Sequence, residues 1–365
     1  MKIAFVIPAY YPAVIGESLY AQELAKYLIK KGHEVNVYTH ISGNLKESEI
    51  ADNVKITRVK IKEIFDGSFY FSSDYIKSIL KEKFDIIHSH HYGYFPATAG
   101  FIAAKLTKTP HVFGTYYHPP VYGRLRWLQF MAYHFTQGLP ILRFSDSVLP
   151  HTLYEKKMLL KIGGKEDNMK ILPNIVDTNT FMPGHDKTKT ILFVGNFIYE
   201  KGAHIAFDIA SQLLEQRKDI RFVFIGNAYE PKLMPKINQL SKSKNVLFLK
   251  NLRKSELVRW YQKASVFLLP SKYEAFSRGI AEAESCSIPV VSTRVGAIPE
   301  VVKDGKSGFL VDYGEWDEMR QHIEYLLDNL SEAKKMGKRG REHIVKNFDT
   351  EIVAEKLEKI YKDLV

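Results

Sequence analysis

The stretch from Val266 to Val291 constrains the fold of this chain more than any other, because it joins two buried strands through a loop and a helix. Short apolar runs stand at its ends, Val266–Leu269 before Pro270 and Val290–Val291 after Pro289. Between them the pattern is typical of a loop followed by a helix. This order predicts parallel strands, and the ligands of such sheets bind at the carboxyl ends of the strands.

Glu274 and Glu282 lie within this stretch. We expect Glu274 in the loop after the first strand, and Glu282 in the helix, about two turns from its start or nearer to it. Carboxylates at this spacing are also common on solvated helix surfaces, so the pair alone does not define a site.

The same strand–loop–helix pattern recurs along both halves of the chain. The first half opens with a strand at 2–7, a loop that contains Gly16, and a helix. The second half restarts with a strand at 190–195 and continues with another at 221–226, and both end in a glycine. The repetition predicts an α/β fold of two Rossmann-like domains, with the hinge in the polar segment 185–189.

Composition limits the kinds of partner. The formal net charge is +11, and both halves share the excess. A diffuse positive field suits phosphorylated ligands or an anionic membrane surface. No helix-turn-helix, zinc-finger or RNA-binding signature accompanies the charge, so nucleic acid is not an expected partner.

Cys286 is the only cysteine, which excludes an intramolecular disulfide. Its apolar surroundings predict a buried thiol rather than a nucleophile.

Hydropathy predicts a cytoplasmic protein. No apolar run reaches the roughly 18 residues of a membrane-spanning helix, and the run after Met1 is too short for a signal peptide.

Residues 119–144 mix cations such as Arg124 and Arg126 with large aromatics such as Trp127. We favour a core helix with a polar edge; the alternative is an amphipathic element that contacts a lipid acceptor or the inner face of a membrane.

Histidines follow two predicted strands in the first half. One strand ends with histidines at 88 and 90–91, and the next strand is followed by His118. Because the ends of parallel strands meet at one edge of a sheet, these side chains are predicted to face a cleft.

The region from 270 to 289 resembles the signature of the retaining GT-B glycosyltransferases of family 4. Ala275 and Ser287 stand where the family commonly has glycine, and residues 170–183 resemble the family's interdomain linker. The resemblance spans nearly the whole chain and is most specific in the second half. The matching positions are Ser271, Tyr273, Glu274, Phe276, Glu282, Ala283 and Pro289.

The resemblance implies the GT-B fold, in which two Rossmann-like domains face each other across a cleft. Residues 1–184 would form the acceptor-binding domain, and residues 185–349 would bind the nucleotide-sugar donor. A terminal helix at 350–365 would cross back onto the first domain.

The resemblance also implies roles for individual residues. Glu274 would meet the transferred sugar and His118 would point at the same centre from the first domain, so these two are the predicted catalytic residues. Lys201 would bind the donor diphosphate, and Glu282 would accept hydrogen bonds from the ribose hydroxyls. The other predicted donor-binding residues are Gly16, Asn196, Gly226, Phe276, Ser277 and Arg278.

The chain departs from its relatives at two of these positions. Relatives have an arginine where Asn196 stands, which weakens the expected hold on a diphosphate. Gly16 stands where many relatives have two glycines, and a simple turn before the helix explains it equally well. No Asp-x-Asp motif occurs. Donor binding is therefore expected to need no metal, and no cofactor is expected besides the nucleotide-sugar co-substrate.

Together these features predict a retaining, metal-independent glycosyltransferase. It would transfer a sugar from a UDP- or GDP-sugar to a hydroxyl of a glycan or lipid-linked acceptor. A nucleotide-sugar-binding protein with little or no transferase activity is the alternative, because of Asn196, Ala275 and the missing glycine at position 15. An epimerase or phosphorylase of the same architecture is less favoured, and nucleic-acid binding rests on charge alone.

Overall fold

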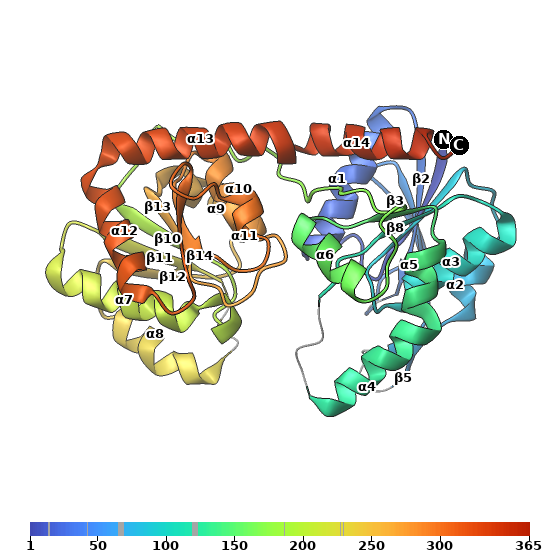
Figure 1. Cartoon of the computed structure of the whole chain (residues 1–365), viewed down its shortest axis with the longest axis horizontal. Coiled ribbons are helices and arrows are strands. Elements are labelled where there is room, and N and C mark those ends of the chain that lie inside the picture. Colours follow the sequence, from blue (N-terminus) through green and yellow to red (C-terminus); the bar gives the residue numbers. More distant parts are fainter. Residues whose placement is uncertain are drawn as a thin grey trace. The chain divides into compact units, whose positions relative to one another are not determined.

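The computed structural model describes residues 1–13, 15–41, 43–64, 69–118, 123–185, 187–226, 228 and 230–365. They form two compact units, one of Met1–Asn174 with Thr350–Val365 and one of Ile175–Asp349. Figure 1 shows that helices lie against the faces of a sheet in each unit. This organisation confirms the predicted α/β fold with two Rossmann-like units.

The first unit is built on a seven-stranded sheet with the order β3-β4-β2-β1-β7-β8-β9. Neighbouring strands are parallel, except that β3 and β4 are antiparallel. A separate antiparallel pair consists of β5 (Lys62–Ile64) and β6 (Phe69–Phe71). The strands of the main sheet are β1 (Lys2–Val6), β2 (Glu34–His40), β3 (Ser48–Ala51), β4 (Val54–Val59), β7 (Ile86–His90), β8 (His111–Gly114) and β9 (Ser147–Leu149).

Helices in this unit come from the first half of the chain and from its end. They are α1 (Gly16–Lys30), α2 (Ser73–Ile79), α3 (Phe95–Thr107), α4 (Arg124–Tyr133), a π-helical turn (His134–Gly138), α5 (Leu139–Phe144), α6 (Leu153–Lys161) and α14 (Thr350–Lys362).

The last helix, α14, is part of the first unit because its inner face is buried there. Tyr361 is fully buried, and its hydroxyl shares a hydrogen bond of 2.6 Å with Nδ1 of His88 in β7. Nε2 of His33, which is largely buried, lies 3.0 Å from a carboxylate oxygen of Glu358. These contacts hold residues far apart in the sequence together.

The second unit is built on a six-stranded, fully parallel sheet with the order β12-β11-β10-β13-β14-β15. Its strands are β10 (Thr190–Val194), β11 (Arg221–Ile225), β12 (Val246–Leu249), β13 (Val266–Leu269), β14 (Val290–Thr293) and β15 (Gly308–Val311). Its helices are α7 (Ala203–Gln216), α8 (Met234–Leu240), α9 (Lys254–Lys263), α10 (Arg278–Ser285), α11 (Ile298–Val301), α12 (Trp316–Asp328) and α13 (Leu330–Phe348), with short 3₁₀ turns at Tyr199–Lys201 and Pro231–Leu233.

Fully buried strands lie at the centre of this second sheet. Every residue of β13 and of β14 is buried. A parallel sheet is covered by helices on both faces, so its central strands are apolar throughout rather than alternating. This is the physical reason why the short apolar runs of the sequence predicted the strands correctly.

The boundary between the units falls earlier than the predicted hinge at 185–189. The second unit already begins at Ile175, because Val176 and Phe181 pack into its core. Arg341 strengthens this attachment by donating a hydrogen bond to the Phe181 carbonyl oxygen at 3.1 Å. The predicted limits of 1–184 and 185–349 are corrected accordingly.

The segment that includes α4 is only partly a core element. Residues 119–122 lie outside the described residues. Within α4, only Tyr133 is buried, whereas Leu125, Trp127 and Leu128 are 70%, 50% and 51% exposed. The core-helix interpretation is therefore wrong for α4, because only its last turn packs into the unit, and it holds for the buried part of α5.

Glu284 lies inside the second unit, where α10 and α13 pack together. Its side chain has no exposed surface, and its Oε1 accepts a hydrogen bond of 2.5 Å from Ser307 Oγ. Its Oε2 is buried without a hydrogen-bond partner among the described residues. Burial raises the pKa of Glu284 to about 8, so the folded protein holds this carboxyl in its neutral form at pH 7.

Glu284→Gln is expected to change how stability depends on pH. The unfolded chain loses this proton near pH 4.5, whereas the folded chain keeps it to about pH 8, so wild-type stability falls as pH rises through that window. Glutamine mimics the protonated carboxyl and removes this loss. At pH 8 the variant should exceed the wild type by at least about 1 kcal/mol in free energy of unfolding.

Urea unfolding at pH 5 and at pH 8 measures this difference. Glu342→Gln, at an exposed position of α13, is the matched control and should follow the wild type at both values. If Glu284→Gln shows the same loss of stability between pH 5 and pH 8 as the wild type, Glu284 does not carry it.

Candidate functional site

The candidate site lies where β10 and β13 end side by side. Leu192 of β10 pairs with Phe267 of β13 in parallel register, so both strands end at the same edge of the sheet. The segment after β10 contains Lys201, at the end of a 3₁₀ turn. The loop after β13 contains Glu274. Both residues therefore lie at the carboxyl edge, which is the ligand-binding edge of an open α/β sheet.

Glu274 and Lys201 form an ion pair at this edge. Lys201 Nζ lies 2.7 Å from Glu274 Oε1, and Ser271 Oγ donates a hydrogen bond to the same oxygen at 2.9 Å. The Glu274 side chain is 5% exposed, whereas that of Lys201 is 33% exposed. Glu274 is thus oriented by two donors, and the partly exposed ammonium group carries further N–H donors that a ligand can use.

The backbone of Glu274 is held as tightly as its side chain. Gly296 has a φ of +55°, and a Cβ there would lie 1.9 Å from the carbonyl oxygen of Glu274. The amide of Ala297 donates a hydrogen bond to that same oxygen at 3.0 Å. Gly202 has a φ of +68°, and its Cβ would lie 1.9 Å from the carbonyl oxygen of Pro270. Glycine at these two places lets three loops close around Glu274.

Glu282 lies one turn into α10, nearer the start of the helix than two turns. Its Oε2 accepts a hydrogen bond of 3.0 Å from the Tyr261 hydroxyl, and a guanidinium nitrogen of Arg278 lies 3.7 Å from its Oε1. Burial raises the pKa of Glu282, although Arg278 and Tyr261 act in the opposite direction. The Glu282 side chain is 12% exposed, so part of its carboxylate reaches the surface. An ionised carboxylate can only accept hydrogen bonds, and a ligand there must donate them.

The start of α10 contains three further predicted donor-binding residues. Phe276 is buried, and its ring centroid lies 5.4 Å from that of Phe348. Ser277 has a φ of +66° and directs the chain into the helix, whose first residue is Arg278. Because the side chain of Phe276 packs in the core, the predicted contact with the donor would have to come from its backbone.

Asn196 and Gly226 follow the ends of β10 and β11. Asn196 is exposed. A Cβ on Gly226 would lie 1.9 Å from the carbonyl oxygen of Gly195, so these two strand ends approach each other closely. Both predicted residues thus lie at the same sheet edge as Lys201.

The predicted site residues of the first unit follow its own strands. Gly16 is the first residue of α1, and a Cβ there would meet no atom of the described chain within 4 Å. Packing within the described residues therefore does not require glycine at this position. His118 follows β8 and is exposed. Their roles toward a donor or a sugar stay predictions.

Two of the histidines predicted to face a cleft, His88 and His90, lie in the core of the first unit together with His111. His88, His90 and His111 are at most 1% exposed, because they lie within β7 and β8 rather than beyond their ends. Nε2 of His111 is 2.8 Å from Ser89 Oγ, and burial lowers the pKa of His111 to about 3. The prediction was wrong for His88 and His90.

The sequence interpretation missed a pair of titratable residues in the first unit. His91 Nε2 lies 3.2 Å from Glu17 Oε2, and the His91 ring stacks on Tyr116 with 5.7 Å between centroids. Burial raises the pKa of Glu17 to about 7 and lowers that of His91 to about 4. Perturbed pKa values are typical of functional sites. Glu17 adjoins Gly16 in the sequence, but no spacing pattern connects it to His91.

Cys286 is fully buried, and burial raises the pKa of its thiol to about 12. This confirms the prediction of a buried thiol. Within the ranges that the structure describes, no group of three or more His, Cys, Asp or Glu side chains is placed to hold a metal ion. Metal independence remains a prediction.

Two family descriptions match almost the entire chain between them. Glycosyltransferase Family 4 matches residues 16–180, and Glycosyl transferases group 1 matches residues 177–343. The first match covers most of the first unit, and the second includes Lys201, Glu274 and Glu282.

Two curated relatives are similar over most of their length. An uncharacterized glycosyltransferase of Methanocaldococcus jannaschii is 28% identical over 97% of this chain and 96% of its own length. A human relative, one of the subunits of phosphatidylinositol N-acetylglucosaminyltransferase, is 25% identical over 99% of this chain and 75% of its own length.

Solved structures share the fold. HepE of Anabaena in complex with UDP aligns with a TM-score of 0.81 at 18% identity and covers 100% of both chains. Sucrose-phosphate synthase from Thermosynechococcus elongatus aligns with a TM-score of 0.79 at 18% identity, covering 100% of this chain and 98% of its own. With its two sheets and the loops after β10 and β13, this chain belongs to the family 4 glycosyltransferases of the GT-B fold.

Proposed function

We propose that this glycosyltransferase is a retaining, metal-independent enzyme that uses a UDP- or GDP-sugar and transfers the sugar to a hydroxyl of a glycan or lipid-linked acceptor. The observation that carries the proposal is the ion pair of Lys201 and Glu274 at the carboxyl edge of the second sheet. It combines a cation for a diphosphate with a carboxylate for a sugar.

Lys201 supplies the positive charge that a leaving diphosphate needs. One of its three N–H donors is directed to Glu274 at 2.7 Å, which orients the ammonium group. The other donors can reach phosphate oxygens, where negative charge grows as the sugar–phosphate bond breaks. Amides in the first turn of α10 add the positive end of the helix dipole. This arrangement needs no metal ion.

Glu274 and Glu282 take different parts of the donor. Glu274 accepts hydrogen bonds from sugar hydroxyls and stabilises positive charge that develops at the anomeric carbon. Glu282 accepts hydrogen bonds from the two ribose hydroxyls, while Tyr261 holds its Oε2 from behind at 3.0 Å. His118 meets the sugar from the first unit.

The names of similar proteins support the proposed classes of donor and acceptor. HepE of Anabaena has been solved with UDP-glucose, which favours a UDP-sugar donor. Relatives in Corynebacterium are named D-inositol 3-phosphate glycosyltransferases, and the human relative is named for phosphatidylinositol. These names favour an acceptor hydroxyl on a polyol or on a lipid-linked group.

A donor panel tests the proposal. We expect one of several UDP-, GDP- and ADP-sugars to release its nucleoside diphosphate when extracts containing glycan or lipid acceptors are present. EDTA should leave the rate unchanged, and the anomeric configuration of the product should equal that of the donor. Donor binding without release would instead favour the nucleotide-sugar-binding alternative, which the exposed Asn196 motivates. Activity restored only by magnesium or manganese after EDTA contradicts metal independence.

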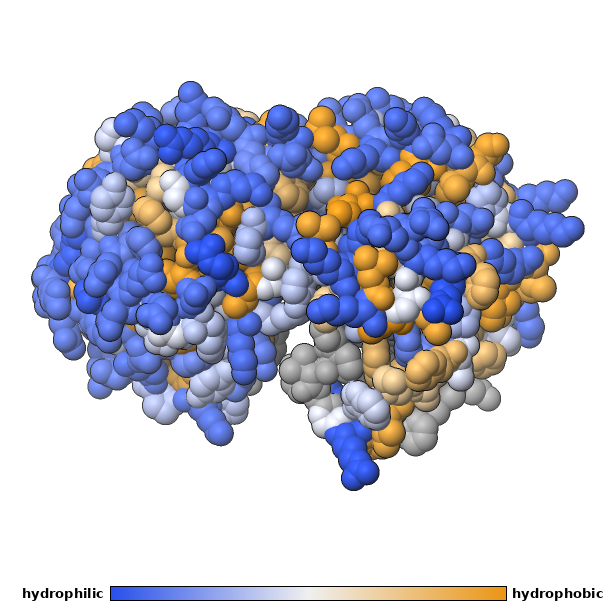
Figure 2. Space-filling view, in the orientation of Figure 1, coloured by the Kyte–Doolittle hydropathy of each residue, from blue (hydrophilic) through white to orange (hydrophobic). Residues whose placement is uncertain are grey.

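We also propose that α4 rests on an anionic membrane surface. None of the helices in the described part of the chain has the length and apolar character needed to cross a bilayer. Over α4 and α5, Figure 2 shows apolar residues at the surface. Between Gly123 and Ser145 the sequence has three arginines and no acidic residue. A basic helix with exposed Leu and Trp side chains is typical of interfacial binding.

Liposome flotation measures this binding. We expect the protein to float with vesicles that contain anionic lipid. The triple variant Leu125→Ser, Trp127→Ser, Leu128→Ser should bind them at least about 10-fold more weakly, because each substitution removes apolar area that the bilayer would cover.

The control for flotation keeps the same chemical change at other exposed apolar positions of the first unit. Ile50→Ser, Leu80→Ser and Leu106→Ser alter side chains that are 77%, 42% and 64% exposed. This triple variant should float like the wild type. Equal loss in both triple variants would show that the binding is not specific to α4, and no flotation of the wild type would rule out the membrane surface.

A further inference from the structure

A cavity distinct from the donor site lies in the second unit, at the amino edge of its sheet. Its volume is about 500 Å³. Ser265, directly before β13, and Pro289, directly before β14, both line it. Lys201 and Glu274 lie at the opposite, carboxyl ends of the same strands. The cavity is therefore separate from the donor site, although both belong to one rigidly packed sheet.

Lysine side chains give this cavity its charge. Lys187 and Lys189 reach it from the segment before β10, and Lys334 and Lys338 reach it from α13. The described lining contains no aspartate or glutamate. A concave surface lined by several positive charges attracts and concentrates anions.

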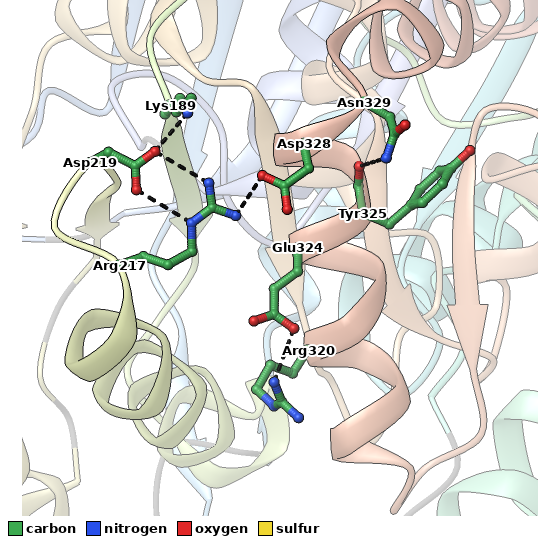
Figure 3. Close-up of polar contacts among 8 residues, drawn as sticks. All are labelled: Lys189, Arg217, Asp219, Arg320, Glu324, Tyr325, Asp328 and Asn329. Carbon is green, nitrogen blue, oxygen red and sulfur yellow. Dashed lines mark hydrogen bonds and ion pairs between the residues drawn. The ribbon is translucent and has the colours of Figure 1, made fainter.

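Acidic residues nearby neutralise this charge only in part. Figure 3 shows Asp219 between Lys189 and Arg217, and Lys189 Nζ lies 2.6 Å from an Asp219 oxygen. Arg217 lies 3.2 Å from the same carboxylate and 2.8 Å from Asp328, so two cations face two carboxylates here and Lys189 adds little net charge to the cavity. Lys338 is 4.0 Å from Glu342, and both side chains are more than half exposed, so this pair is weak.

The other two lysines have no ion pair with any residue that the structure describes. Lys187 Nζ donates a hydrogen bond of 2.7 Å to the carbonyl oxygen of Ser287, which positions its charge without cancelling it. Lys334 extends from the first turns of α13. These two ammonium groups remain for a bound anion.

Apolar residues complete the cavity. Leu330 and Ala333 of α13 face it together with Pro289, and Leu330 is 54% exposed. Small-molecule sites are typically lined by apolar groups with a few charged ones, and their volumes are roughly 300–1,000 Å³. A ligand for this cavity would combine phosphate groups for the lysines with a ring or aliphatic part for the apolar wall.

We propose that the cavity is a second binding site, which takes a phosphorylated small molecule with an apolar or ring portion, of about the size of a nucleotide. Lys187 and Lys334 bind the phosphate groups, and Leu330 and Pro289 contact the apolar portion. Phosphate chemistry is shared by free metabolites and lipid headgroups, and the cavity at the sheet edge fits a free molecule.

Lysine acetylation read by mass spectrometry tests the site directly, because each lysine is reported separately. ADP should protect Lys187 and Lys334 from acetylation, and inorganic pyrophosphate should do so only at about 10-fold higher concentration, since it lacks an apolar portion. Lys242 and Lys244, exposed lysines outside the cavity, should react equally with and without ligand. Protection of Lys201 reports the donor site independently.

Charge reversal supplies the second measurement. In a Lys201→Met background, which weakens the donor site, ADP binding by calorimetry should weaken at least about 10-fold on Lys187→Glu with Lys334→Glu. The matched control, Lys242→Glu with Lys244→Glu, makes the same change of net charge and should leave the affinity unchanged.

Three outcomes would overturn the proposal. Equal weakening in both double variants would assign ADP binding to the diffuse charge of the protein. Absence of protection at Lys187 and Lys334 by millimolar ADP and pyrophosphate would show that the cavity binds neither. Protection by vesicles of phosphatidic acid, but not by ADP, would assign the lysines to a lipid headgroup rather than to a free molecule.

Discussion

Replacing Glu274 with glutamine should lower the rate of sugar transfer by at least about 100-fold and leave the protein folded. Glutamine keeps the shape of the side chain and one acceptor oxygen for Lys201 and Ser271, which now lie 2.7 and 2.9 Å from Glu274 Oε1. It removes the negative charge that would stabilise the anomeric centre. The loss should therefore appear in kcat, while the thermal midpoint changes little.

Lys201→Met separates the charge of the lysine from its packing. We expect a comparable loss of transfer, because the diphosphate loses its cation. Lys272→Met, an exposed lysine of the neighbouring loop, is the matched control and should keep wild-type activity. Since Lys201 and Glu274 are in direct contact, the effects of the two substitutions should not add in the double variant.

Retention of more than about a tenth of the transfer activity in Glu274→Gln would exclude this carboxylate from the reacting centre.

Gly296→Ala should strongly destabilise the second unit. Both Gly296 and Gly305 have a positive φ, +55° and +68°, so alanine carries a similar backbone cost of about 1–2 kcal/mol at each. Only at Gly296 would the added Cβ collide, 1.9 Å from the carbonyl oxygen of Glu274. We expect Gly296→Ala to cost at least about 2 kcal/mol more in free energy of unfolding than Gly305→Ala.

Activity should follow the same order. To relieve the collision the loop after β13 must shift, and Glu274 moves with its own carbonyl group. Gly296→Ala should thus lose transfer activity even at temperatures where it stays folded, whereas Gly305→Ala, whose Cβ meets no described atom within 4 Å, should keep it. Denaturant unfolding and initial rates on the two variants provide the comparison. Equal stability of both would show that the loop adjusts without cost.

The strands and site loops of the second unit were predictable because their signals are local. An apolar run of four or five residues that ends in glycine or proline indicates a buried parallel strand, and β10 and β13 are such runs. The side chain that follows such a strand must lie at the carboxyl edge, so the placement of Glu274 needed only the order of elements. Its contact with Lys201 needed the strand order, because β10 and β13 are neighbours although β11 and β12 separate them in sequence.

The errors have a different origin. A histidine near the end of a strand can point into the core or toward solvent, and the burial of His88 depends on α14, which no local pattern reveals. Likewise, the polar segment 185–189 resembles a linker, but Phe181 had already joined the second core. For α4, mixed aromatics and arginines suit both a buried and an exposed helix, and only its packing decides.

By itself, then, the sequence determined the α/β class, the repeated strand–loop–helix units and the sheet edge where Glu274, Glu282 and Lys201 lie, since each follows from hydrophobic periodicity and chain order. The tertiary structure alone decided that Lys201 and Ser271 share one oxygen of Glu274, that Gly296 and Gly202 admit the backbone contacts around it, and that the lysines before β10 and on α13 line one cavity. Such contacts join residues distant in the sequence, and their geometry depends on how the strands are ordered and packed.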